Sequence, residues 1–254
     1  MGYLHHIAAR RGHDVQLLER DNELGGQLRI AHVPPGKAEI KPFLDYLIRQ
    51  TQKLGVKIQT AVTVDLETIR QRSPDAVIVA TGSVPLGLTG GGGGKVDIAS
   101  AWDVLRGKAN PGERVVVAGG GATGCEVAEH LRAQGKDVTI VERGHELARD
   151  MNPLGEGVRH FMIERLQRDG VKFMLEAEFL GVDGAGVSVK DKEGATVHLN
   201  ADTLVTSFGV SPNRDFTQAA LNAFVPEAYL VGDCVKPGNL LYATRGAAIV
   251  ALQL

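Results

Sequence analysis

The chain has 254 residues, of which 43% are hydrophobic and 23% charged, and its formal net charge is −2. This is the balance of a globular protein, and it gives no sign of a nucleic-acid-binding surface. No apolar run approaches the roughly 18 residues that a membrane span needs, and the first residues lack the apolar stretch of a signal peptide.

Cysteine and histidine usage excludes several kinds of redox and metal chemistry. The two cysteines, Cys125 and Cys234, are far apart and form no Cys-x-x-Cys pair, and an iron–sulfur cluster usually takes four thiolates. The histidines show no spacing typical of a metal site. We therefore expect a cytoplasmic protein without a disulfide framework, a metal, a membrane anchor or a nucleic-acid partner.

The sequence contains an internal repeat. Residues 10–24 (RRGHDVQLLERDNEL) align without gaps with residues 133–147 (AQGKDVTIVERGHEL), and seven of the fifteen positions are identical. Two further matches follow in the same order, 55–58 with 170–173 and 75–82 with 202–209. Three matches in one order indicate a duplicated βα unit.

The first copy of the repeat is predicted to start with a helix over residues 3–11 and to continue as a strand that ends at Glu19. The second copy has a strand and a glycine-rich loop ahead of its helix, and this stretch, residues 114–123, aligns with nothing in the first copy. We therefore expect the N-terminus to be truncated, by cloning, by gene prediction or by divergence. The first strand and first phosphate-binding loop would then be missing.

A run of glycines separates the first copy from the next predicted elements. A strand over residues 76–80 is expected to end in the turn Ala80-Thr81-Gly82, and five successive glycines follow at 90–94. Such a run is flexible and cannot pack in a core, which suits a crossover between domains. Ser100 and Asp103 have the spacing of a helix cap, so a helix over residues 100–105 is predicted to open the inserted domain.

The second copy carries the pattern of a dinucleotide-binding unit. A β-branched strand over residues 114–118 leads into Gly119-Gly-Gly121-Ala-Thr-Gly124, then a helix over 125–134 and a strand over 137–141. In that context G-x-G-x-x-G lets the backbone approach a pyrophosphate, which the helix N-terminus attracts. Glu142, 18 residues after the last glycine, would accept hydrogen bonds from the ribose hydroxyls.

Glu142 also bears on the choice of nicotinamide cofactor. An acid at this position pairs with a free 2′-hydroxyl and repels a 2′-phosphate, so we expect NADH in preference to NADPH. The adjacent Arg143 could instead turn toward a phosphate, and its position alone does not decide between these two outcomes.

The remaining segments are predicted to be mainly short strands. Residues 171–199 alternate as four strands, 171–175, 179–182, 186–190 and 196–199, and are expected to form a β-meander. A strand over 228–231 is expected to end at Gly232-Asp233, ahead of a helix over 244–254.

These residues together resemble the C-terminal FAD/NAD(P)-binding module of fused Old Yellow Enzyme-type NADH:flavin oxidoreductases. That family includes 2,4-dienoyl-CoA reductase, enoate reductases and trimethylamine dehydrogenase, and it lies within the pyridine-nucleotide–disulfide oxidoreductase superfold. The resemblance rests on Glu19-Arg20, on Leu24 to Leu28 and Pro34 to Lys37, on Ala80-Thr81-Gly82, on the 119–124 loop and on Val231 to Cys234.

The resemblance implies an α/β fold with two Rossmann-like three-layer nucleotide-binding domains, one inserted in the other, and with β-meanders. The FAD-binding (or ADP-binding) domain would comprise residues 1–100 and 208–254, and the NAD(P)H-binding domain residues 101–207.

The loop pattern and the resemblance together give the candidate cofactor-binding residues. They are Glu19, Arg20, Gly25, Gly26, Gln27, Ala80, Thr81, Gly82, Gly119, Gly121, Ala122, Thr123, Gly124, Glu126, Glu142, Arg143, Gly209, Gly232 and Asp233. By resemblance, Asp233 would bind a ribityl hydroxyl of FAD. Glu126 would lie near the nicotinamide, or would only stabilise the helix dipole. No side chain is expected to act as a catalytic acid or base.

The implied function is that of a flavoprotein oxidoreductase module. It would pass hydride from NAD(P)H to FAD, for onward transfer to an acceptor on an upstream flavin-bearing barrel, and the fragment alone would be inactive. FMN and an iron–sulfur cluster are expected only in that upstream part. The alternative is a non-catalytic scaffold that binds ADP, as in trimethylamine dehydrogenase-like enzymes. A homo-oligomer is left open.

Overall fold

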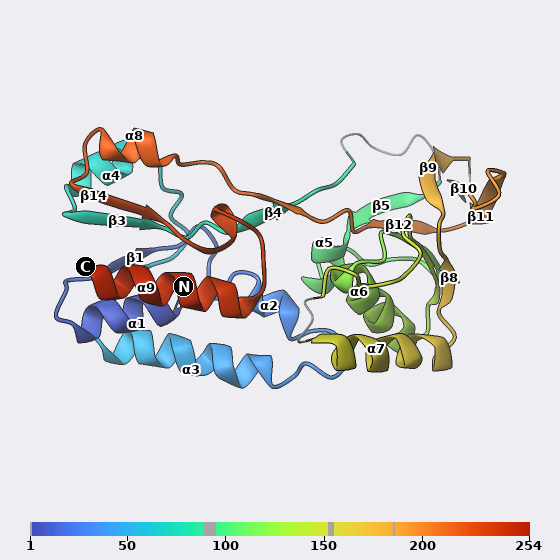
Figure 1. Cartoon of the computed structure of the whole chain (residues 1–254), viewed down its shortest axis with the longest axis horizontal. Coiled ribbons are helices and arrows are strands. Elements are labelled where there is room, and N and C mark those ends of the chain that lie inside the picture. Colours follow the sequence, from blue (N-terminus) through green and yellow to red (C-terminus); the bar gives the residue numbers. More distant parts are fainter. Residues whose placement is uncertain (1, 89–94, 152–154, 185) are drawn as a thin grey trace. The chain divides into compact units, whose positions relative to one another are not determined.

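A computed structural model of the chain describes residues 2–88, 95–151, 155–184 and 186–254 (Figure 1). The glycine run expected to mark a domain crossover, 89–94, lies outside the described residues. The chain divides into two compact units. The outer unit comprises Met1–Arg29, Glu39–Val84 and Val210–Leu254, and the inner unit comprises Ile30–Ala38 and Pro85–Gly209.

The inner unit is built on a five-stranded sheet with the order β5-β12-β6-β7-β8, in which every neighbouring pair is parallel. The strands are β5 (Asp97–Ser100), β6 (Arg114–Ala118), β7 (Asp137–Val141), β8 (Lys172–Met174) and β12 (Thr203–Thr206). The helices are α5 (Ala101–Leu105), α6 (Ala122–Ala133) and α7 (Glu156–Arg168). Most side chains of β6, β7 and β12 are buried, as expected for a parallel sheet with covered faces.

The inner unit also carries a three-stranded antiparallel sheet of β9 (Glu178–Asp183), β10 (Gly186–Lys190) and β11 (Thr196–Asn200). This confirms three strands of the predicted meander. The first predicted strand, 171–175, is present, but it does not belong to the meander. Its residues form β8, which pairs in parallel with β7 at the edge of the main sheet, because α7 returns the chain to that sheet as a βαβ crossover.

The outer unit has two separate two-stranded parallel sheets. One pairs β1 (Gln16–Leu18) with β2 (Lys57–Gln59), and the other pairs β3 (Ala76–Val79) with β14 (Glu227–Leu230). Its helices are α1 (Gly2–Arg10), α3 (Ile40–Lys53), α4 (Leu66–Arg72), α8 (Gln218–Asn222) and α9 (Leu240–Gln253), with α1 packed on α9 (Figure 1). Three short elements lie at or next to the unit boundary, namely α2 (Leu28–Ala31) and the paired strands β4 (Ser83–Pro85) and β13 (Val210–Pro212).

The structure repeats itself in the way that the sequence does. β1 pairs with β2 in the same register as β7 with β8, so that Leu18 faces Gln59 where Val141 faces Met174. The N–H of Glu19 donates to the carbonyl of Gln59 at 2.9 Å, and the N–H of Glu142 donates to that of Met174 at 2.8 Å. Glu19 and Glu142, both candidate cofactor-binding residues, therefore have matching backbone positions.

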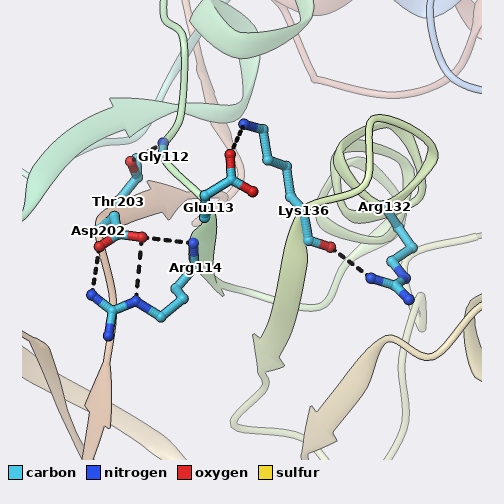
Figure 2. A network of polar contacts seen from close by, with 7 residues as sticks. All are labelled: Gly112, Glu113, Arg114, Arg132, Lys136, Asp202 and Thr203. Atoms are coloured by element: carbon cyan, nitrogen blue, oxygen red, sulfur yellow. Dashed lines mark hydrogen bonds and ion pairs between the residues drawn. The ribbon is translucent and has the colours of Figure 1, made fainter.

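At the start of β6 a group of polar contacts fixes the sheet (Figure 2). The Asp202 carboxylate accepts hydrogen bonds from the backbone N–H of Arg114 at 2.8 Å and from its guanidinium at 2.6 Å. These bonds lower the pKa of Asp202 from its ordinary value to about 2. The contacts lie where β6 and β12 begin, so they anchor the strands at the end of the sheet opposite the glycine loop.

Candidate nucleotide-binding sites

The glycine loop of the inner unit connects β6 to α6 in a close turn. Gly119 has a φ of 105°, and a Cβ there would lie 2.2 Å from the carbonyl oxygen of Ser207. A Cβ on Gly124 would lie 1.9 Å from the carbonyl oxygen of Gly119. The strand and helix therefore approach one another more closely than any larger residue permits, which is the geometry of a dinucleotide-binding turn.

Glu142 lies against this loop. Its Oε2 accepts a hydrogen bond from the N–H of Gly120 at 2.6 Å, and its Oε1 accepts one from the N–H of Gly144 at 2.6 Å. The carboxylate predicted to bind ribose is therefore at the loop predicted to bind pyrophosphate. Arg143 is exposed, whereas Ala122 and Thr123, in the first turn of α6, are half-buried.

A second carboxylate, that of Asp150, also contacts the loop. Its Oδ1 accepts a hydrogen bond from the N–H of Ala122 at 2.8 Å, and its Oδ2 would lie 3.2 Å from a Cβ on Gly121. Sequence reasoning missed Asp150, because it belongs to no motif and reaches the loop only through the fold of the segment after β7.

Glu126 is largely buried in α6 and forms an ion pair with Lys37. Lys37 is the last residue of the Pro34 to Lys37 stretch on which the resemblance partly rests. Both residues belong to the inner unit. The ion pair directs the Glu126 side chain toward Lys37, and its place near the nicotinamide or its action on the helix dipole stays a prediction.

In the outer unit, three side chains from distant segments meet at the ends of β3 and β14. Gln27 Nε2 donates to Ser83 Oγ at 3.0 Å and to Asp233 Oδ2 at 3.1 Å, and Ser83 Oγ lies 3.2 Å from the same Asp233 oxygen. The N–H of Gly238 donates to Asp233 Oδ1 at 3.2 Å. Sequence reasoning missed Ser83, although it directly follows the predicted Gly82.

The parallel pairing of β3 with β14 explains why this cluster forms. Their carboxyl ends lie at one edge, where ligands bind in open α/β sheets. Gly82 has a φ of 76° and Gly232 a φ of 69°, so both turns use backbone that favours glycine. Thr81 is exposed at the same edge. Ala80 instead packs against the core formed by α1 and α9, so its contacts are those of a core residue.

The other candidate residues make separate local contacts or adopt glycine-specific backbone. Glu19 Oε1 accepts a hydrogen bond from the N–H of Asp21 at 3.0 Å, and Arg20 is exposed. A Cβ on Gly25 would lie 2.9 Å from a methyl group of Leu44. Two further glycines have positive φ, 50° at Gly26 and 92° at Gly209. Within the described residues, no hydrogen bond or ion pair joins these positions to Asp233.

Both cysteines are buried. Burial raises the pKa of the Cys125 thiol to about 12, with a further contribution from the carboxylate of Asp150, and burial also raises the pKa of Cys234. These thiols stay protonated near neutral pH, so neither is a nucleophile there. Within the described ranges, no three His, Cys, Asp or Glu residues form a group that could hold a metal ion.

The chain belongs to the pyridine nucleotide-disulphide oxidoreductase family, whose sequence pattern matches residues 3–247. The α/β fold with Rossmann-like nucleotide-binding domains is therefore confirmed, and the family is one of oxidoreductase flavoproteins that bind FAD and NAD(P)H. Across the parts of the chain that the structure describes, no helix is long and apolar enough to cross a membrane.

Two relatives and one solved structure are much longer than this chain. It is 38% identical to an NADH oxidase of Thermoanaerobacter brockii, over 97% of this chain and 38% of the oxidase. It is 34% identical to a cinnamate reductase of Clostridium sporogenes, over 98% of this chain and 37% of that protein. A structure of 2-naphthoyl-CoA reductase in complex with 2-naphthoyl-CoA matches with a TM-score of 0.90 and 25% identity, covering all of this chain and 38% of that one.

Proposed function

We propose that the chain is the nucleotide-binding module of a larger flavoprotein reductase. The 119–124 loop and Glu142 of the inner unit would hold NADH, and Gln27, Ser83 and Asp233 of the outer unit would hold FAD. The bound cofactors would supply hydride transfer, with onward delivery to an acceptor on an upstream barrel. The barrel would carry FMN and an iron–sulfur cluster. Support for a larger protein comes from the two longer relatives named above, of which the chain spans 38% and 37%.

The single observation that carries this proposal is the hydrogen bond between Glu142 and the glycine loop. The N–H of Gly120 is directed at the Glu142 carboxylate at 2.6 Å, and Ala122 offers another N–H at the start of α6. A dinucleotide needs a phosphate contact at the loop and a ribose contact at the end of the following strand, and these groups lie at those two places. The glycine cradle and the donor set fit such a ligand.

The cluster of Gln27, Ser83 and Asp233 supports FAD, rather than ADP, in the outer unit. It presents a carboxylate, a hydroxyl and an amide at one sheet edge, and these groups match the hydroxyls of a ribityl chain. ADP has no such chain. In this proposal Glu19 binds the adenosine ribose, as its matching position to Glu142 suggests.

The phosphate-binding loop of the FAD site is proposed to come from a segment that precedes α1. In the inner unit β6 lies between β12 and β7. Their repeat counterparts β3 and β1 belong to separate sheets. All four residues of β12 are buried, but only Val79 of β3 is. A strand that precedes α1 would pair with the free edges of β3 and β1 and cover β3.

The cytoplasmic location stays a prediction that rests on cysteine usage.

The test uses the natural protein that contains this chain. We expect it to carry extractable FAD in a one-to-one ratio to chain, and NADH to bleach that flavin in the absence of oxygen. Asp233→Ala should lower the FAD content, whereas Glu193→Ala, at an exposed turn of the inner unit, should not. Extraction of ADP in place of FAD would overturn the proposal in favour of the scaffold.

A further inference from the structure

Two carboxylates, not one, are bonded to the amides of the glycine loop. Glu142 accepts from Gly120 at 2.6 Å, and Asp150 accepts from Ala122 at 2.8 Å. The N–H of Ala122 belongs to the first turn of α6, a helix of 12 residues. Amides at this place attract anions, because they are unpaired within the helix and lie at its positive end. Asp150 therefore occupies the position that the proposed function gives to a nucleotide phosphate.

The backbone, rather than the side chain, holds Asp150 in this position. The N–H of Ala148 donates to the carbonyl of Gly120 at 2.7 Å, and the N–H of Met151 donates to that of Ala148 at 3.1 Å. Leu147 and Ala148 are both buried, which anchors the segment after β7 against the loop. Asp150 itself is exposed. Its side chain can therefore rotate away from Ala122 without disturbing the core.

The pKa of a neighbouring thiol reflects the negative charge of Asp150. Asp150 contributes to the raised pKa of Cys125 ahead of Glu126 and Glu142, after burial itself. Gly121 has no side chain, and the three atoms nearest to a Cβ there, at 3.2–3.4 Å, all belong to the Asp150 carboxylate. The space above Gly121 is thus shared between this carboxylate and any bound anion, and two anions cannot occupy it together at low cost.

We propose that Asp150 is an internal competitor of the nucleotide phosphates. The inference rests on the proposed NADH site. Binding exchanges the Asp150 carboxylate at Ala122 for a pyrophosphate oxygen, so Asp150 weakens the affinity for phosphate-bearing ligands and favours their release. Adenosine, which has no phosphate and is positioned by Glu142, is not subject to this competition.

The test is titration calorimetry of the chain and its Asp150→Asn and Asp150→Ala variants with NADH, ADP and adenosine. Both variants should bind NADH and ADP about tenfold more tightly, the change expected for removing one charge-assisted hydrogen bond. Their affinity for adenosine should not change. Glu193→Gln is the matched control, because it removes one carboxylate from an exposed turn of the same unit.

Each other outcome overturns the inference in a recognisable way. If the chain and its Asp150 variants bind NADH equally, Asp150 does not compete, and the proposed function still stands. Weaker binding by the variants would show that the carboxylate shapes the loop for its ligand. Equal tightening for adenosine would indicate a general effect of charge or packing. If NADH binds to none of the proteins, the proposed function itself fails.

Discussion

Replacing Gly124 by Ala tests how closely the glycine loop is packed. The new Cβ would lie 1.9 Å from the carbonyl oxygen of Gly119, whereas ordinary contacts are 3.4–4 Å. Because that neighbour is backbone, β6 or α6 must move. Overpacking of this kind costs about 3 kcal/mol. The gain in helix propensity offsets about 1 kcal/mol, so we expect a net loss of about 2 kcal/mol in the free energy of unfolding.

The matched control is Gly157→Ala in α7, where, among the described residues, no atom outside the helix's own adjoining backbone lies within 4 Å of the new Cβ. It should be neutral or stabilising by up to about 1 kcal/mol. Urea unfolding can be followed by the fluorescence of Trp102, the sole tryptophan, which is buried in α5 and reports on the inner unit. Equal stability of the two variants would refute the geometry of the turn.

Three further predictions concern charge and reactivity. Glu142→Gln should narrow the preference for NADH over NADPH. At an effective dielectric near 20 we expect that preference to be about ten- to several-hundred-fold in affinity. Calorimetric affinities for both cofactors measure it, and an unchanged ratio would show that Arg143, not Glu142, determines the choice of cofactor. The pKa of Asp202 is held at about 2, mainly by Arg114. Because this folded-state pKa is depressed, the bond stabilises the native state above about pH 4 and is lost as the pH falls through 2. Asp202→Asn should therefore lower the unfolding temperature clearly at pH 7 and much less at pH 2, where the Asp202 carboxyl is partly protonated, and an equal deficit at both would argue against an ionic origin. Finally, a thiol reagent at pH 8 should label Cys125 only after unfolding, and rapid labelling of the native chain would contradict its burial.

Strands with a strong local pattern could be predicted from the sequence. The predicted bounds 114–118 and 137–141 agree with β6 and β7 residue for residue, because β-branched runs between turn signals specify buried parallel strands. The cap before α5 is also confirmed. Ser100 Oγ accepts from the N–H of Asp103 at 3.0 Å and donates to its carboxylate at 2.7 Å.

Features that depend on tertiary partners could not be predicted in this way. β8 has only three residues, and nothing in them shows whether the partner is β7 or a meander strand. Ser83 and Asp150 reach their sites only because distant segments fold back on them, over separations of 150 and 28 residues. The predicted roles of Glu19, Glu142 and Asp233 as ligand contacts stay predictions until a cofactor is bound.

The most direct test of the central claim is the binding of NADH to the glycine loop. Gly121→Asp would place a fixed carboxylate above the loop, and the atoms nearest to the new Cβ, at 3.2–3.4 Å, belong to the Asp150 side chain and not to backbone. We predict that the chain binds one NADH, and that this variant, with Trp102 still buried and stability unchanged, binds at least about a hundredfold more weakly. Equal binding by the variant, or no binding by the original chain, would contradict the account.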